Sequence, residues 1–214
     1  MPLRRRLLAE FLGTGFLLAA VVGSGIMGVA LSAGNDGIAL LANAGATAAV
    51  LYVLIAVLGP VSGAHFNPVV TLALRLEGRI ASRDAAAYIA LQLAGAVAGV
   101  LLAHAMFGQA LWQPGNHART GFGQWLSEAV ATFGLVLTIL LGARRAPTAV
   151  AALVAAYIFA AYWFTASTSF ANPAVTLARS LTSSFPGIRA GDVLAFVLSQ
   201  GVGALAGWWV ARRL

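Results

Sequence analysis

The segment NPVVTLALRL, residues 67–76, returns near the other end of the chain as NPAVTLARSL, residues 172–181. Each copy is apolar over only about ten residues, whereas a membrane-spanning helix needs about 20. Asparagine is a favoured N-cap, and proline is favoured at the first helical position because its missing N–H is not needed there. Each copy therefore predicts the start of a short helix. One Asn-Pro pair alone could simply cap an ordinary interfacial helix. Two pairs in matched copies favour two short helices that act together.

Six longer apolar segments surround these two copies. The chain is 60% hydrophobic and 9% charged, while a globular domain is nearer 25% charged. So few charges cannot cover a water-soluble surface, and most of the surface must face lipid. The predicted spanning helices cover residues 6–31, 38–59, 83–107, 123–143, 148–167 and 190–211. We therefore expect one all-α membrane domain over residues 1–214.

The basic residues, all of them arginines, orient this bundle. Three of them, Arg119, Arg179 and Arg189, fall on one side of a six-helix topology. The others fall on the opposite side: Arg4, Arg5, Arg6, Arg75, Arg79, Arg83, Arg144, Arg145, Arg212 and Arg213. The positive-inside rule then places both termini in the cytoplasm, and we expect the membrane to be a bacterial inner membrane. Arginines that flank apolar segments indicate topology rather than a nucleic-acid partner.

A signal peptide is a less favoured interpretation of the N-terminus, and the composition excludes one kind of chemistry. The arginine-rich N-terminus with its apolar continuation resembles a signal peptide, but the apolar segment is long enough to span and Glu10 interrupts its start. The chain has no cysteine, which excludes disulfides, thiolate metal sites and a thiol redox centre.

The chain also repeats itself outside the Asn-Pro copies. AEFLGTGFLL around Glu10 resembles SEAVATFGLVL around Glu128, and LQLAGAVAG around Gln92 resembles LSQGVGALAG around Gln200. Three matches in the same order indicate two homologous halves, about residues 1–110 and 120–214. Each half holds three spanning helices, an odd number, so the halves have opposite orientations in the membrane. An inverted repeat of this kind places the functional site at the interface of the halves, near the midplane.

The two short helices then dip in from opposite sides, and their N-termini meet. A helix N-terminus carries about half a positive charge, so two facing N-termini disfavour protons and other cations at the midplane. The side-chain amides of Asn67 and Asn172 offer N–H donors to a neutral solute oxygen. This arrangement predicts a path for neutral, hydrogen-bonding solutes.

Over nearly its whole length the chain resembles the aquaporin, or major intrinsic protein, family. The resemblance is carried by AEFLGT, SGAHFNPVVTLAL, QLAGA, SEAVATFGLV and NPAVTL. It implies six transmembrane helices plus two re-entrant half-helices in a right-handed bundle, a homotetramer with one pore per subunit, and passive flux of small neutral solutes, without catalysis or a cofactor. The corresponding pore motifs are Asn67, Pro68 and Val69, where the family usually has alanine at the third position, and Asn172, Pro173 and Ala174.

Glu10 and Glu128 are intramembrane carboxylates, which are costly and usually functional. One interpretation is proton coupling in a secondary transporter. The resemblance implies instead that each carboxylate accepts backbone N–H groups of a re-entrant loop and anchors it. Gln92 and Gln200 could hold helices together or line the pore, and both alternatives stay open.

The resemblance also assigns His65 and Phe66 to the pore lining, with His65 at the cytoplasmic mouth. We expect no metal site, because no carboxylate or second histidine lies at ligand spacing from His65. His104 and His117 are expected in interfacial or loop positions.

The narrowest part of the pore, by the same resemblance, is a ring of four positions. They fall at Thr47, Ala160, Ser169 and Val175. The last is usually an arginine, and here it is aliphatic. Because all four residues are small, we predict a wide selectivity filter for solutes larger than water, such as glycerol-like polyols. The pattern NPAVTLAR resembles bacterial aquaglyceroporins associated with arsenic resistance, which implies arsenite or methylated arsenicals; an ordinary water-selective aquaporin is the alternative.

Arg179 offers a rival source of charge near this ring. It lies four residues after Val175, one helical turn further on about the same face. It could therefore act as a displaced filter arginine at the outer pore. More often, an arginine at this place satisfies the negative end of the short helix and the solvent there.

Overall fold

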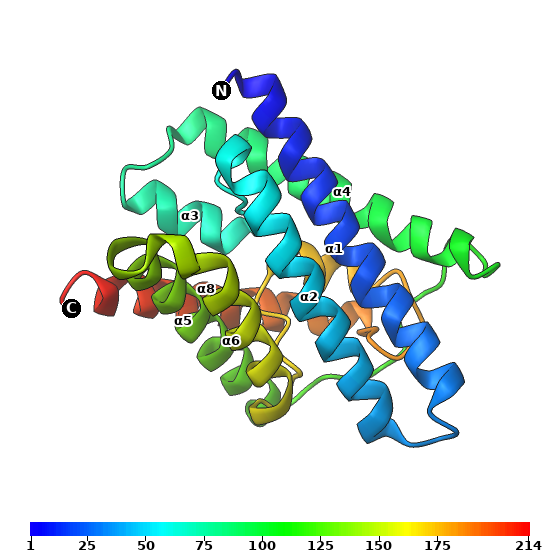
Figure 1. Ribbon diagram of the computed structural model, residues 1–214. Helices are drawn as coiled ribbons and strands as arrows, with labels where there is room; N and C mark the ends of the chain where they lie inside the picture. Colours follow the sequence, from blue (N-terminus) through cyan, green and yellow to red (C-terminus); the bar gives the residue numbers. More distant parts are fainter.

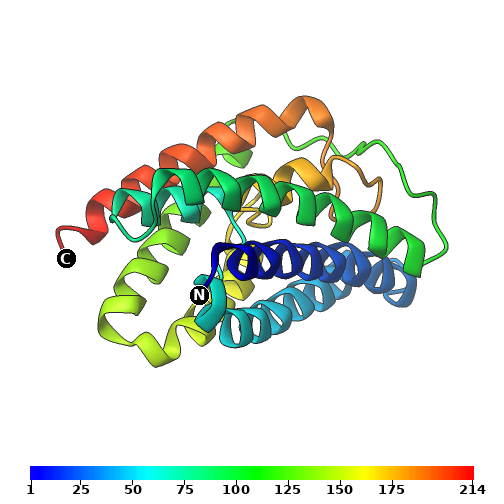
Figure 2. The ribbon, with the colours of Figure 1, turned by 90° about the horizontal axis from the view of Figure 1, so that it is seen from above.

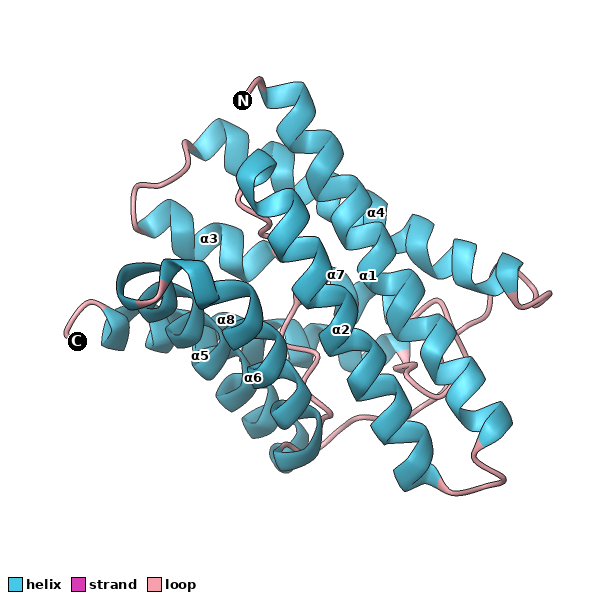
Figure 3. Ribbon diagram, in the orientation of Figure 1, coloured by secondary structure: helices cyan, strands magenta, loops and turns pink.

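The computed structural model describes all 214 residues, and all its regular secondary structure is helical (Figures 1 and 3). Six helices are long and apolar enough to cross a membrane. The helices are α1 (Leu3–Leu31), α2 (Asp36–Ser62), α3 (Pro68–Leu76), α4 (Ser82–Met106), α5 (Phe122–Arg145), α6 (Val150–Phe164), α7 (Pro173–Arg179) and α8 (Val193–Ala211). The predicted all-α fold with six long and two short helices is confirmed, and the two short helices, α3 and α7, begin at the two prolines.

The helices form two closely packed pairs, α1 with α4 and α5 with α8, while α2 packs against α1 and α6. The short helices α3 and α7 contact each other, and each of them also contacts both α4 and α8. Figures 1 and 2 show both chain termini at one end of the bundle, opposite the connections α1–α2 and α4–α5. This common end is the one to which the sequence assigns ten of the arginines.

Glycines set the spacing within the two pairs. A Cβ atom at Gly99 of α4 would lie 2.1 Å from the carbonyl oxygen of Gly15, and one at Gly203 of α8 would lie 2.1 Å from that of Ala129. No side chain fits at such a distance. Small residues therefore let the backbones of each pair approach closely, as is common between helices in membranes.

The bundle carries its apolar side chains outside and much of its polarity inside. Phe16, Val57 and Val202 are all more than half exposed, while Glu10 and Gln200 have no exposed surface. In lipid this distribution is favourable, since no water is available to solvate polar groups on the outside. The interior polar groups must therefore find their partners within the fold, and they do so around the two re-entrant loops.

Candidate functional site

The two loops that precede α3 and α7 are joined through their asparagines. The Asn67 side chain donates its Nδ2–H to the carbonyl oxygen of Ala171 at 2.8 Å, and Asn172 donates to that of Phe66 at 2.8 Å. Each asparagine oxygen also caps its own short helix. The Asn67 oxygen accepts from the Val69 N–H at 3.0 Å, and the Asn172 oxygen accepts from the Ala174 N–H at 3.0 Å. A primary amide has two N–H donors, so one on each asparagine remains for a solute.

The same loops hold non-glycine residues in the left-handed backbone region at matched positions. Ala64 and Phe66 have φ of 49° and 48°, and Ser169 and Ala171 have φ of 51° and 47°. These residues stand three and one positions before each asparagine. Such conformations cost of order 1–3 kcal/mol each and persist only where the surroundings hold them. Strain repeated in both loops is typical of a functional site.

Glu10 supplies part of that hold for the first loop. Its carboxylate accepts from the backbone N–H groups of His65 at 3.0 Å and Phe66 at 2.8 Å. It also accepts from the Ser62 hydroxyl at 2.6 Å and the Gln92 amide at 2.8 Å. Four donors therefore surround one fully buried carboxylate.

Glu128 has the same position beside the second loop. It accepts from the backbone N–H groups of Phe170 and Ala171, each at 2.9 Å, and from the Gln200 amide at 2.6 Å. Gln200 in turn donates to the hydroxyl of Thr176 at 2.8 Å. Of the two roles left open for the glutamines, the contacts match the one that holds helices and loops together.

His65 lies in the first loop, between the end of α2 and the start of α3. Its Nδ1 is 3.1 Å from the Thr71 hydroxyl, and its ring centroid is 5.0 Å from that of Tyr88. His65 and Phe66 both line the central cavity. No group of three potential metal ligands occurs in the structure.

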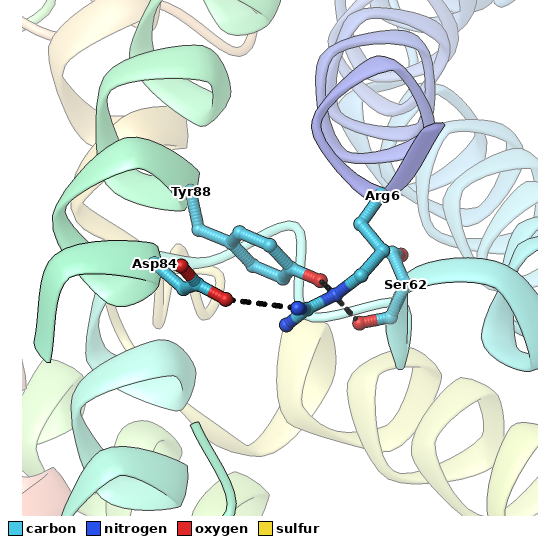
Figure 4. A network of polar contacts seen from close by, with 4 residues as sticks. All are labelled: Arg6, Ser62, Asp84 and Tyr88. Atoms are coloured by element: carbon cyan, nitrogen blue, oxygen red, sulfur yellow. Dashed lines mark hydrogen bonds and ion pairs between the residues drawn. The ribbon is translucent and has the colours of Figure 1, made fainter. Parts of the chain in front are cut away.

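A polar network behind His65 ties the N-terminus to this loop (Figure 4). Arg6 donates to the Tyr88 hydroxyl at 2.7 Å and pairs with Asp84 at 2.9 Å. Tyr88 then donates to the carbonyl oxygen of Ser62 at 2.8 Å, and the Ser62 hydroxyl donates to Glu10. Sequence reasoning used Arg6 only for topology, since nothing in the sequence pairs it with helix α4.

A cavity of about 100 Å³ runs past both asparagines. It is lined by 22 residues, of which 17 are hydrophobic. The polar groups that it does hold are therefore few and well placed: the two asparagine amides, His65, and the hydroxyls of Thr47 and Tyr162. This composition suits a solute with both polar and apolar faces.

The structure brings only two of the four expected filter residues, Thr47 and Val175, to the cavity wall. Ala160 is exposed on the outer face of α6 and does not line the cavity. Because a helix turns 100° per residue, the lining stripe of α6 runs every fourth residue, ending at Ile158 and Tyr162. The expectation of Ala160 in the ring is corrected to Tyr162, whose hydroxyl donates to Thr47 Oγ1 at 3.3 Å.

The second loop also departs from the expected ring. Ser169 is buried, its hydroxyl has no partner, and it is not among the lining residues. Phe170, the next residue, lines the cavity instead. The cavity wall that includes Val175 therefore also includes the aromatic rings of Tyr162 and Phe170, and the ring of four small residues predicted from the sequence is not what the cavity presents. The four-residue spacing Val150, Val154, Ile158, Tyr162 was the sequence signal that could have found Tyr162.

A second cavity, of about 270 Å³, lies at the end of the bundle opposite the termini. Arg179 lines it together with Arg119 of the α4–α5 connection. The Arg179 guanidinium lies 3.3 Å from the centroid of the Phe170 ring and donates its Nε–H to the carbonyl of Pro186. Burial lowers the pKa of Arg119. Arg119 is a residue that sequence reasoning missed, having been counted only for topology.

Comparison with known proteins finds a matching family, similar sequences and a similar fold. Residues 1–162 match the family described as major intrinsic protein. The chain is 58% identical to aquaglyceroporin AqpS of Rhizobium meliloti over 99% of this chain and 91% of that protein. It is 34% identical to the probable aquaporin AqpM of Archaeoglobus fulgidus over 100% and 98% of the two chains. The fold is similar to the X-ray structure of the aquaglyceroporin from Plasmodium falciparum, with a TM-score of 0.74, 16% identity, and 99% and 95% coverage.

Proposed function

The chain belongs to the major intrinsic protein family, and from this premise we propose that it is a passive channel for polyol-sized neutral solutes as well as for water. That it is an integral membrane channel for water and small solutes, and not an enzyme, follows from the family. The size and chemistry of the larger solutes are the proposal. The observation that carries it is the cavity wall at Thr47, Tyr162 and Val175, which presents hydroxyls and an aliphatic side chain but no guanidinium. We infer that this part of the cavity is the constriction of the pore.

Such a constriction has two chemically different sides. Tyr162 donates to Thr47, which leaves the Thr47 O–H free to be donated to a passing oxygen. Val175 and Phe170 offer only carbon. Glycerol has the complementary form, with hydroxyls on one edge and a carbon backbone on the other, so it can exchange water for contacts on both sides. Arsenous acid, a neutral trihydroxide of similar size, and methylated arsenicals are included in the proposal.

Protons are excluded, on this proposal, at the pair of asparagines. The N-termini of α3 and α7 face each other there, each carrying about half a positive charge. The cross-bonds between the loops fix both amides so that each presents one N–H to the lumen. A neutral oxygen accepts such donors, whereas hydronium meets a positive potential.

The carboxylates act as anchors rather than as proton carriers in this proposal. Glu10 accepts four hydrogen bonds and Glu128 accepts three. A carboxylate that took up a proton would turn one acceptor into a donor facing other donors. Proton-coupled transport through Glu10 or Glu128 remains the alternative function, with a plain water-selective aquaporin as another.

The architecture around the pore is part of the same proposal. The matched networks of Glu10 with Gln92 and of Glu128 with Gln200 support an inverted repeat with halves near residues 1–110 and 120–214. We place both termini in the cytoplasm of a bacterial inner membrane and expect a homotetramer with one pore per subunit.

Flux through the purified protein in liposomes tests the function. Water, glycerol and arsenous acid permeabilities would be measured by light scattering and solute uptake. We expect saturation-free flux that is linear in the solute gradient and unchanged by an uncoupler. Uptake that collapses with an uncoupler would establish the transporter instead, and water flux without glycerol flux would establish the water-selective alternative.

A further inference from the structure

The second cavity holds two guanidinium groups without a carboxylate partner. Arg179 is 1% exposed, and its Nη1 has no hydrogen-bond partner. Arg119 donates Nε–H to the carbonyl of Gly187 at 2.8 Å and Nη1–H to that of Ser167 at 3.2 Å. Neither residue belongs to any ion pair of the protein.

No carboxylate of the protein hydrogen-bonds either guanidinium, whose partners are all carbonyl oxygens. The chain has only six acidic residues. Three form ion pairs with other arginines, namely Asp84, Glu77 and Asp192; Asp192 also accepts the backbone N–H of Arg119 at 2.9 Å, but not its guanidinium. Two, Glu10 and Glu128, accept the loop N–H groups. Asp36 alone is free; it is exposed, lies at the wall of the same cavity, and pairs with neither arginine.

A buried charge is normally paired or bound to a ligand, since leaving it alone in a medium of low polarity is costly. The Arg179 guanidinium gains some compensation from the Phe170 ring, at 3.3 Å, and Arg119 lies 4.9 Å from the centroid of the same ring. Stacking on one ring fixes the planes of both guanidiniums. The Arg179 Nη1 has no partner within the protein, and both arginines line the cavity.

We propose that Arg179 and Arg119 form an oxyanion-binding site in the second cavity, which takes a small carboxylate or a tetrahedral oxyacid anion. A guanidinium presents a planar fork that matches either group in a bidentate manner. The cavity volume of about 270 Å³ admits such an anion with some of its water. Asp36 at the rim repels the ligand and so keeps its residence short. The site goes beyond the channel function and does not depend on which neutral solute passes Val175.

The test measures binding of two probes, acetate and inorganic phosphate, to the purified full-length protein. Titration calorimetry at constant ionic strength, set with chloride, gives the affinity, and thermal unfolding gives the stabilisation that binding to the native state produces. We expect saturable binding of at least one probe. Arg179→Gln and Arg119→Gln each should weaken it about tenfold or more, because each removes charge-assisted hydrogen bonds.

Two further variants make the result specific. Arg189→Gln removes the same charge from the same end of the bundle, but Arg189 does not line the cavity. Because its partner Asp192 also accepts the Arg119 backbone N–H, the affinity of Arg189→Gln for the probes should fall, but clearly less than that of Arg119→Gln. Asp36→Asn should tighten binding. If Arg179→Gln does not fold, the affinity of Arg119→Gln for the two probes tests the proposal, since Arg119 is only half-buried.

The proposal is overturned if the wild-type protein binds neither probe in a saturable manner, or if Arg119→Gln binds both as tightly as the wild type. An equal loss in Arg189→Gln would also overturn it, since that would indicate a general charge effect. None of these outcomes bears on glycerol flux, so failure of this site and failure of the channel function are distinguished.

Discussion

Val175 and Arg179 lie one helical turn apart on α7, yet Val175 lines the central cavity and Arg179 lines the second one. The charge that the family usually carries next to the second asparagine motif is therefore absent from the constriction and present one turn away. Between the two cavities stands the Phe170 ring, which lines the first and contacts the Arg179 guanidinium. Selection at the constriction can thus rest on shape and hydrogen bonding.

Returning a guanidinium to the constriction tests this separation. Val175→Arg should lower glycerol permeability about tenfold or more, because the side chain fills the lumen and its donors bind water strongly. Water permeability should fall less. Val175→Met, which adds length without charge, separates the effect of size from that of charge. Unchanged glycerol flux in Val175→Arg would contradict a filter at this position.

The correction from Ala160 to Tyr162 makes its own prediction. Tyr162→Phe keeps the ring and removes one hydroxyl, so glycerol permeability should fall about 2–10-fold, the effect of one neutral hydrogen bond. Ala160→Leu, on the outer face of α6, should leave flux unchanged. Both are read by stopped-flow light scattering. The opposite pattern, with loss in Ala160→Leu alone, would restore the ring expected from the sequence.

The barrier to cations should depend on the neutrality of the asparagine pair. Asn172→Asp keeps an N-cap for α7 but brings a negative charge to the midplane. We expect proton entry, followed with a pH-sensitive dye inside vesicles, to rise clearly above that of the wild type. Asn35→Asp is the matched control, since Asn35 caps α2 at the exposed end of the bundle. Equal proton entry in all three proteins would speak against a midplane barrier.

Glu10 should matter for stability and not for coupling. Glu10→Gln places an amide N–H₂ among four donors, and each unsatisfied buried group costs about 1–3 kcal/mol. Thermal unfolding in detergent should show a clear loss, while Asp36→Asn, at an exposed position without an ion pair, should show none. A stable Glu10→Gln protein whose solute flux has lost a dependence on the proton gradient would favour the transporter.

Close packing of α1 against α4 can be tested at a glycine. Gly99→Ala would bring a methyl group to 2.1 Å from the carbonyl oxygen of Gly15, so the helices must separate, at a cost of about 1–3 kcal/mol. Gly45→Ala meets nothing within 4 Å and should be neutral or slightly stabilising. Equal thermal stability of the two variants would show that the helices can shift without cost.

Much of the fold follows from local sequence signals. Apolar length determined the six spanning helices, and the Asn-Pro pairs determined where α3 and α7 begin, because N-capping and the fixed proline φ act within a few residues. Burying a charge in lipid demands partners, which marked Glu10 and Glu128 as important residues, but it was the resemblance to the family that implied the loops as those partners.

Contacts between distant segments were decided only by the tertiary structure. The rotation of α6 brings Tyr162 rather than Ala160 to the cavity, since a shift of two residues turns a side chain to the opposite face of a helix. The packing of the α4–α5 connection over α7 brings Arg119 and Arg179 to one cavity. Local signals reveal what must be buried, but the partner that each buried group meets depends on how the helices pack.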